Sequence, residues 1–251
     1  MNLLSLKNPY YEFYQLDDNI NINSFDERIY TFFVVSGKIS FKISDQFVQV
    51  NENEGLLVSQ NTKIQEIKKD RNSFVFMVRS KKKTNQLFEF VDQNNEIKEV
   101  LVNGFKILKD HKKVTKPWGY ELWIVWLKDY HVLKKIHMKK GFKCSLQFHE
   151  KKYETNFLIS GKAKVIKDKH INPNSSEEDA KKELKNVNLL ADYSKDYNAL
   201  SAFTNIPGEI HRVYSLEDYT AYEVSTPELD DVIRIVDDNN RISGRIKTEH
   251  K

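Results

Sequence analysis

The sequence has little cysteine and few glycines, and both shortages exclude whole classes of protein. Cys144 is the only cysteine, so the chain has neither an intrachain disulfide nor a CxxC metal or redox motif. No two of the eight glycines lie within ten residues of each other. A dinucleotide-binding GxGxxG, a Walker A loop and a GxSxG nucleophile elbow all need closely spaced glycines. A Rossmann dehydrogenase, a P-loop kinase and an ordinary α/β-hydrolase are therefore excluded.

Long hydrophobic runs and a strong charge of one sign are also missing. No stretch approaches the roughly 18 apolar residues of a membrane helix, and the first residues lack the apolar core of a signal peptide. Lys and Arg number 40 against 36 Asp and Glu, a net charge of +4 over 251 residues that does not indicate nucleic acid. We expect a globular cytoplasmic protein with no nucleic-acid or membrane partner.

Short β-strands are the predominant pattern of the chain. They are rich in β-branched and aromatic residues and are separated by turn residues. The predicted strands are 30–35, 38–43, 73–78, 121–126, 130–138, 156–160, 162–166 and 220–225. The fold class is therefore all-β.

Two segments depart from this pattern. Thr84–Asp92 has apolar residues at helical spacing and predicts a short helix in a linker. The stretch 168–195 is polar and charged, and we interpret it as a solvated loop inserted between two strands. Within it, Ser175 and Glu178 have the spacing of a capping box, which would open a short helix through Leu184.

An internal repeat indicates two similar units. Ser36-Gly37-Lys38 and Ser160-Gly161-Lys162 each follow one apolar strand and precede another. Repetition of a hairpin-rich unit predicts two small β-barrels of jelly-roll type in tandem.

Four residues of the second repeat have the spacing of a metal site. Gln147 and His149 are two residues apart, so they share one face of a strand. Glu154 opens the next strand, and His211, in Pro-Gly-x-x-His, comes from a distant one. Imidazole and carboxylate ligands suit zinc, iron, manganese or nickel. We predict a divalent metal held by these four side chains.

These spacings resemble the two motifs of the cupin superfamily, with Gln147 in place of the usual first histidine. The chain is similar in particular to the C-terminal cupin domain of type II mannose-6-phosphate isomerases. Lys116–Glu121 resembles the start of that domain, and the run 230–238 resembles its end. The resemblance covers about residues 112–245 and departs from the family at Lys152, where the isomerases have an arginine.

The resemblance implies a bicupin with three segments: a degenerate cupin barrel over 1–80, a linker over 81–110, and a metal-binding cupin barrel over 111–251 with an insertion at 168–195. The places that correspond to metal ligands in the first barrel hold Asn23, Phe25, Tyr30 and Gln65. We therefore expect no metal in the first barrel.

The resemblance also implies a function, a metal-dependent sugar-phosphate isomerase of surface-polysaccharide or sugar-nucleotide metabolism. Its cofactor would be a divalent metal, zinc first and manganese, nickel or iron as alternatives, and its partner a second copy of the chain in a homodimer. Catalytic candidates are Lys134, Lys152 and Arg234, and substrate-binding candidates are Trp118 and Arg212. Two alternatives remain open, a cupin dioxygenase and a non-catalytic sugar-binding or regulatory cupin.

Overall fold

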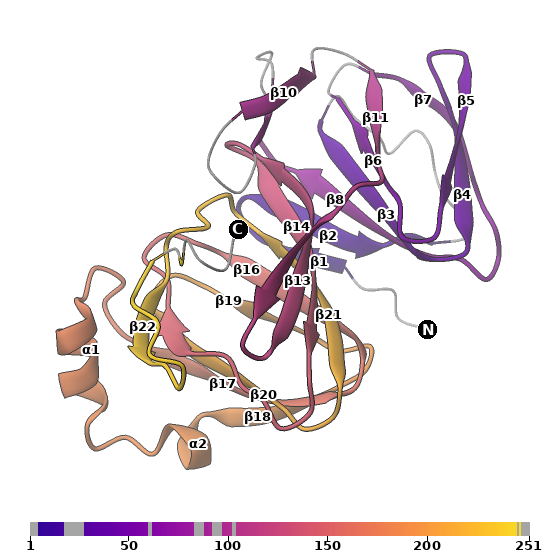
Figure 1. Cartoon of the computed structure of the whole chain (residues 1–251). Coiled ribbons are helices and arrows are strands. Elements are labelled where there is room, and N and C mark those ends of the chain that lie inside the picture. The colour runs from indigo at the N-terminus through magenta and orange to yellow at the C-terminus, as the bar shows by residue number, and fades with distance from the viewer. Residues whose placement is uncertain are drawn as a thin grey trace. The chain divides into compact units, whose positions relative to one another are not determined.

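The chain divides into two compact units (Figure 1). The computed structural model describes residues 5–17, 28–59, 62–82, 88–91, 97–101, 104–244 and 246. The first unit is Met1–His111 with Ile124–His131, and the second is Lys112–Trp123 with Val132–Lys251. Residues 81–110, predicted as a linker, are counted with the first unit in this division.

Two antiparallel sheets make up most of the first unit. The larger sheet has the strand order β1-β2-β8-β3-β6-β11, and the smaller has the order β5-β4-β7. The strand bounds are β1 (Ser5–Lys7), β2 (Tyr11–Gln15), β3 (Tyr30–Ser36), β4 (Lys38–Ile43), β5 (Gln46–Asn51), β6 (Gly55–Val58), β7 (Ile64–Lys69), β8 (Phe74–Ser80) and β11 (Phe105–Leu108).

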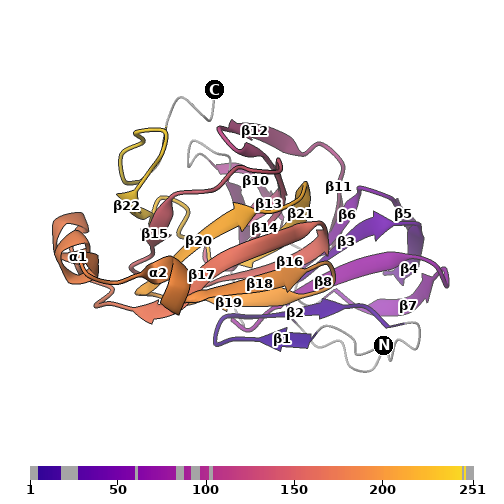
Figure 2. The ribbon, with the colours of Figure 1, turned by 90° about the horizontal axis from the view of Figure 1, so that it is seen from below.

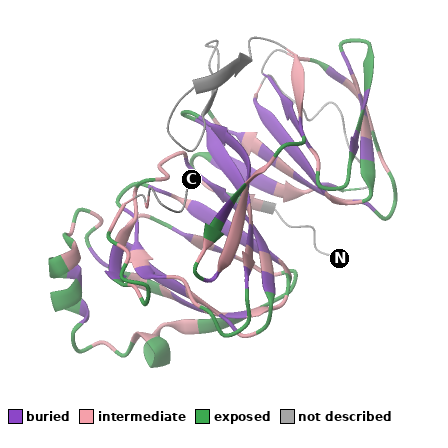
Figure 3. Cartoon of the chain, in the orientation of Figure 1, coloured by how far each residue is buried: buried purple, intermediate pink, exposed green. Residues whose placement is uncertain are grey.

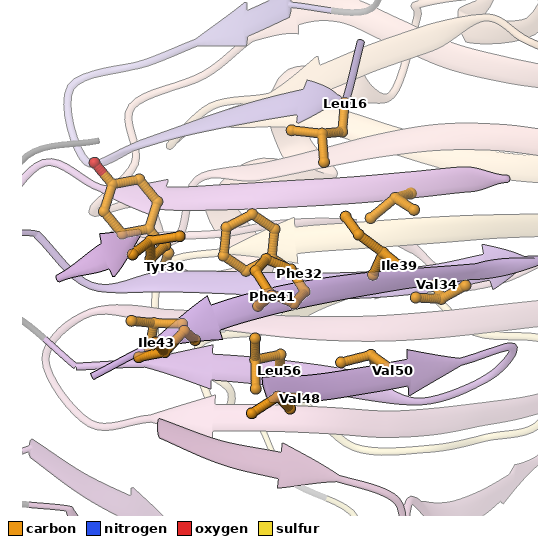
Figure 4. Packing of buried hydrophobic residues seen from close by; sticks show 13 residues of the cluster. Leu16, Tyr30, Phe32, Val34, Ile39, Phe41, Ile43, Val48, Val50 and Leu56 are labelled. Atoms are coloured by element: carbon orange, nitrogen blue, oxygen red, sulfur yellow. The ribbon is translucent and has the colours of Figure 1, made fainter. Parts of the chain in front are cut away.

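A hydrophobic core fills the space between the sheets of the first unit (Figure 4). Alternate residues of the small sheet point inward, as in β4, where Ile39, Phe41 and Ile43 are buried. They pack against side chains of the larger sheet, including Phe32, whose ring centroid lies 4.8 Å from that of Phe41. This alternation is what places one face of each sheet against the other.

The helix predicted over Thr84–Asp92 is wrong where the structure describes it. Phe88–Val91 is strand β9, which pairs with β10 (Ile97–Leu101). The sequence Phe-Glu-Phe-Val alternates with a period of two and is rich in residues that favour strands. Residues 84–87 and 92 lie outside the described part of the chain.

The second unit is also built from two antiparallel sheets. One includes the neighbouring strands β13-β14-β21-β16-β19, with β12 and β9 also paired to β13, and the other has the order β18-β17-β20-β15-β22 (Figure 2). The bounds are β12 (Lys112–Lys116), β13 (Gly119–Leu127), β14 (His131–Met138), β15 (Leu146–Phe148), β16 (Glu154–Ser160), β17 (Lys162–His170), β18 (Ser194–Asn198), β19 (Ala202–Asn205), β20 (Glu209–Ser215), β21 (Tyr219–Ser225) and β22 (Ile233–Val236).

The strand pairing confirms the internal repeat. In the first unit β3 pairs with β6 and β8, and β4 pairs with β5 and β7. In the second unit β16 pairs with β19 and β21, and β17 pairs with β18 and β20. Six strands in each unit therefore follow one plan, and the bicupin fold class is confirmed.

The glycines of the repeat stand where the chain passes from one sheet to the other. Gly37 has a φ of 79° and Gly161 a φ of 82°, a left-handed conformation that favours glycine. A Cβ added at Gly161 would lie 2.1 Å from a main-chain oxygen. Both the conformation and the space therefore require glycine in the second unit.

The insertion at 168–195 is not the solvated loop that we expected, but the short helix predicted to run through Leu184 is confirmed. The insertion contains helix α1 (Glu177–Leu184) and the short helix α2 (Leu189–Asp192). Ala180 and Leu184 of α1 are buried in a cluster with residues of β15, β17, β20 and β22, while the rest of α1 faces outward (Figure 3). The cap is Ser176, whose hydroxyl accepts from the Asp179 N–H, one residue later than the predicted pair. Among the described residues no helix is long and apolar enough to cross a membrane.

Candidate metal centre

Strand register brings the distant parts of the predicted site together. Gln147 lies directly opposite His211 in the pairing of β15 with β20. His149 follows the last residue of β15, and Glu154 is the first residue of β16. Two strands of one sheet and the first residue of a strand in the other therefore contribute to the same place in the second unit.

His149, Glu154 and His211 form a compact group of possible ligands. Glu154 Oε2 lies 3.5 Å from His149 Nε2, and Glu154 Oε1 lies 3.5 Å from His211 Nε2. The two imidazole centroids are 5.1 Å apart. All three side chains are buried, and one donor atom from each falls within 4.8 Å of the others.

The second ring nitrogen of each histidine is fixed by the backbone. His149 Nδ1 contacts the carbonyl oxygen of Asp231, and His211 Nδ1 lies 2.9 Å from the carbonyl oxygen of Glu209. A carbonyl only accepts, so each Nδ1 donates and each Nε2 of the neutral ring carries a lone pair. Among the residues that the structure describes, the buried Nε2 of His149 has no hydrogen-bond partner. This orphaned atom, aimed at Glu154, fits a metal ion.

The charges around these groups favour metal-binding protonation states. Burial lowers the pKa of His211 to about 4, so its imidazole is neutral at pH 7. Burial alone would raise the pKa of Glu154, but the Lys152 ammonium outweighs this effect and holds it well below its usual range. Glu154 is therefore a carboxylate and His211 a neutral imidazole, the forms that metal binding requires.

Gln147, the fourth predicted ligand, reaches the group through its amide. Its Nε2 lies 3.2 Å from His211 Nε2, and its Oε1 accepts a hydrogen bond of 2.5 Å from the Ser145 hydroxyl. The amide nitrogen rather than the oxygen thus faces the histidine. Ligation by Gln147 would need the amide turned over, and its role as a ligand stays a prediction.

Lys152, predicted at the rim of the cavity, lies inside it. Its Nζ donates to Glu154 Oε2 at 2.6 Å and to Glu223 Oε1 at 3.0 Å, and the residue is only 5% exposed. Burial would lower the pKa of this lysine, but the charges of the two glutamates raise it instead. Lys152 is therefore a permanent cation beside a possible metal ligand.

A row of alternating charges continues from Lys152. Glu223 Oε1 lies 3.8 Å from Lys134 Nζ, which lies 3.6 Å from Glu121 Oε2. Glu121 also lies 3.7 Å from Lys116 and accepts from the Trp123 indole N–H. Burial would raise the pKa of Glu121, but Lys116 and Lys134 bring it to about 2. Lys134, a predicted catalytic residue, is thus buried among carboxylates.

The sequence analysis missed Glu121, Glu223 and Asn205 as residues of the site. Asn205 donates its Nδ2–H to Glu154 Oε1 at 2.7 Å. Glu223 was detectable as a single carboxylate within the apolar predicted strand 220–225, and Glu121 as part of the run Lys116–Glu121. The signal for Asn205 was absent, since an asparagine just before a proline-glycine turn is ordinary.

The remaining candidates divide between the cavity and its surroundings. Trp118 lines the cavity and also belongs to the hydrophobic core of this unit. Arg234 lines the cavity as well, but its Nη1 donates to the carbonyl oxygens of Ile242 and Gly244 at 2.5 and 2.7 Å. Arg212 does not line it: it follows His211 in the strand, points to the opposite face, and pairs with Asp238. The substrate-binding role predicted for Arg212 has no support in this arrangement.

Apart from Arg212 and Asn205, these groups line one cavity of about 130 Å³ in the second unit. Its charged lining nearly balances, with both signs represented by several side chains. The charged residues that line it are Lys116, Glu121, Lys134, Lys152, Glu154, Glu223, Asp230, Arg234 and Arg241. The cavity suits a small polar ligand rather than an apolar one.

The corresponding positions of the first unit carry other chemistry. The place of Glu154 is taken by Tyr30, which is buried in the hydrophobic core. The place of His211 is taken by Gln65, whose side chain contacts Asp45 at the surface. Asn23 and Phe25, at the other two places, lie outside the described residues. The prediction of no metal in this unit stays a prediction.

The comparisons with known proteins support the cupin resemblance. Residues 103–196 match the family model described as mannose-6-phosphate isomerase C-terminal. No curated protein sequence matches the chain. Similar solved structures include protein YlbA of E. coli (TM-score 0.58, 8% identity, 90% of this chain and 82% of that one). Two oxalate decarboxylases are also similar. That of Lactobacillus farciminis has a TM-score of 0.53 and 10% identity over 93% and 86% of the chains. That of Bacillus subtilis, which has Mn(II) centres, has a TM-score of 0.51 and 8% identity over 90% and 75%.

Proposed function

We propose that this chain, a bicupin of the cupin superfamily that resembles mannose-6-phosphate isomerases over residues 103–196, is a metal-dependent sugar-phosphate isomerase. The reaction would interconvert an aldose phosphate and a ketose phosphate in sugar-nucleotide or surface-polysaccharide metabolism. One observation carries the proposal: His149, Glu154 and His211 share a cavity with the buried cations Lys134 and Lys152.

The cofactor of this proposal is a divalent metal held by His149, Glu154 and His211, with Gln147 as a fourth ligand. When bound, such a metal polarises the oxygen atoms of a sugar. Two imidazoles and one carboxylate are donors that zinc accepts, and manganese, nickel and iron also accept them. We place zinc first among these metals.

The buried lysines supply fixed positive charge. Proton transfer between neighbouring carbons of a sugar passes through an enediolate, whose negative charge needs stabilisation. Lys152 keeps its proton because Glu154 and Glu223 raise its pKa, so it acts through its charge and not as a base. Lys134, 8% exposed in its side chain, supplies a second cation in the same cavity.

Glu223 is the side chain to which we assign proton transfer. Glu154 belongs to the metal group, and Glu121, with a pKa of about 2, is a weak base. Glu223 lines the same cavity and lies between Lys152 and Lys134. The two lysines would hold its carboxylate in place while it takes a proton from one carbon and returns it to the next.

The substrate class follows from the charge of the cavity. Its cationic and anionic side chains nearly balance, so a divalent metal would leave an excess of positive charge. A phosphate dianion suits that excess, as a neutral sugar would not.

The test is turnover of mannose 6-phosphate to fructose 6-phosphate by the protein loaded with zinc or manganese. We expect Glu223→Gln and Lys152→Ala each to lower kcat by about a hundred-fold or more, the scale for losing a base or a charge stabiliser. Lys151→Ala is the matched control, because Lys151 is exposed beside Lys152 and lies outside the cavity. Absence of wild-type turnover on any aldose phosphate contradicts the proposal.

A cupin dioxygenase is the second candidate, favoured by the donor set itself. Two histidines and one carboxylate also make the ligand set of non-haem iron oxygenases. The protein loaded with Fe(II) would then consume oxygen in the presence of its substrate. The buried cations of the cavity favour the isomerase, since they suit an anionic sugar intermediate.

A further inference from the structure

One residue outside the metal group holds four consecutive residues of the loop that carries it. The carboxylate of Asp231 accepts from the Glu150 N–H at 2.9 Å, the Lys151 N–H at 2.6 Å and the Lys152 N–H at 2.8 Å. The carbonyl oxygen of Asp231 contacts His149 Nδ1. Residues 149–152 therefore make four contacts with a single residue that is some 80 positions later in the chain.

Strand pairing explains why Asp231 lies there. β22 begins two residues after it and pairs with β15, so that Ile233 lies opposite Phe148. His149 leaves β15 at the same end. The segment before β22 consequently runs beside the loop after β15, and three successive main-chain N–H groups turn toward one carboxylate. Such a concave set of N–H groups is a recurrent anion site of the backbone.

The side-chain carboxylate and the main-chain carbonyl of Asp231 have different roles. The carboxylate fixes the position of the residue against the loop, and the carbonyl then meets His149. Because that carbonyl only accepts, it holds the proton of His149 on Nδ1 and leaves Nε2 as the lone pair that faces Glu154. The same anchor fixes the backbone of Lys152, whose ammonium pairs with Glu154.

We infer that Asp231 is the positioning residue of the metal centre, which sets the tautomer and orientation of His149 through its anchored main chain. The inference rests on the proposed metal site but not on the proposed reaction. Groups that orient metal-bound histidines typically change metal affinity by about 10- to 100-fold when they are altered.

The experiment compares Asp231→Asn with the wild type. The asparagine amide keeps one acceptor oxygen but replaces the other with an NH2 donor. That donor cannot accept from the main-chain N–H groups of residues 150–152, so part of the anchor is lost. The main-chain carbonyl of residue 231 is unchanged by the substitution. Glu150→Gln is the matched control, because it changes an exposed side chain of the same loop and keeps every main-chain contact. Titration with zinc alone measures the affinity, and proton–nitrogen correlation NMR of the metal-free protein reports the tautomer of each histidine.

We expect His149 of the wild type to carry its proton on Nδ1. In Asp231→Asn we expect a mixture of tautomers at His149, unchanged His211, and zinc binding weaker by about 10- to 100-fold. Glu150→Gln should behave as the wild type. An Nε2 proton on His149 of the wild type overturns the inference, whatever the variants do.

Two further results for Asp231→Asn would also overturn it: wild-type zinc affinity, or weaker zinc binding with an unchanged His149 tautomer. Failure of the proposed function is distinguishable. If the tautomer and the zinc affinity change as expected but the protein has no isomerase activity, the role of Asp231 is supported and the proposed reaction is contradicted. If the wild type binds no zinc, the tautomers of the metal-free proteins still decide the role of Asp231.

Discussion

Replacement of Lys152 by methionine tests the charge arrangement of the cavity most directly. Methionine keeps a long unbranched side chain and removes the ammonium that lies 2.6 Å from Glu154 and 3.0 Å from Glu223. Both carboxylates are at least nine-tenths buried and would lose their counter-charge. Removal of one partner from a buried ion pair typically costs about 3–5 kcal/mol. We expect the free energy of unfolding of the metal-free protein to fall by about that amount at pH 7.

The stability lost in Lys152→Met should depend on pH in a defined direction. Glu154 has a lowered pKa in the folded wild type, so its contribution to stability is present above its unfolded pKa of about 4.5 and is lost as the pH falls through the folded value. Without Lys152 this contribution disappears. The difference in stability between Lys152→Met and the wild type should therefore be largest at neutral pH and should narrow below about pH 4.

A divalent metal should compensate for the missing ammonium. The variant offers zinc a carboxylate that no longer has a cationic partner, so zinc should raise its unfolding midpoint more than that of the wild type. Lys152→Arg keeps the charge and serves as the control. The assay is urea unfolding at pH 7 and pH 3, with and without zinc. A free energy of unfolding for Lys152→Met within 1 kcal/mol of the wild type at pH 7, without zinc, would refute the reasoning.

Three other predictions concern single positions. His211→Ala should abolish metal content in elemental analysis, whereas Gln65→Ala at the corresponding place of the first unit should leave it unchanged. Gly161→Ala should cost more than about 3 kcal/mol in chemical unfolding, since an added Cβ would lie 2.1 Å from a carbonyl oxygen; Gly141→Ala, at a φ of 81° with open space around it, should cost only about 1–2 kcal/mol. Glu121 has its pKa lowered from 4.5 to about 2, so it contributes on the order of 3 kcal/mol above pH 4.5 that is lost between pH 4.5 and 2. Glu121→Gln should remove this part of the acid unfolding profile. An unchanged profile would contradict the pairing of Glu121 with Lys116 and Lys134.

The sequence was sufficient for features that depend on local spacing. The turns at Gly37 and Gly161 join strands of defined length, so the repeated Ser-Gly-Lys predicted the tandem fold. His149 and Glu154 are close along the chain, and the short loop from β15 to β16 brings them together. His211 came from its turn motif, since the proline-glycine pair fixes where β20 begins.

Contacts that depend on which residues of two strands lie opposite each other could not be predicted from the sequence. Glu223 meets Lys134 because β21 and β14 pair at that position, and Asp231 meets His149 because β22 pairs with β15. No spacing along the chain encodes either register. The burial of Lys152 was equally hidden, since lysine is seldom buried and becomes so here only between two carboxylates.

The insertion shows a different limit of sequence reasoning. Its composition is polar because most of α1 faces outward, and only Ala180 and Leu184 enter the core. Two apolar residues four positions apart are too few for a recognisable amphipathic pattern, so only the capping-box spacing predicted the helix. The helix is held by packing against β22 and the neighbouring strands. The amino-acid composition of the insertion gives no sign of that packing.

The two units show that the requirements of the fold and of the site are separate. Both have the same pairing of six strands, the same glycine turn and an apolar core between their sheets. Tyr30 can replace Glu154 in that plan because an aromatic side chain at the start of the strand packs into the core as a neighbour of Phe32. A carboxylate at the same place needs compensation, which Lys152 and Asn205 supply in the second unit. The buried charges of the second unit are therefore not demanded by the fold, and their presence together is the physical reason to look for chemistry there.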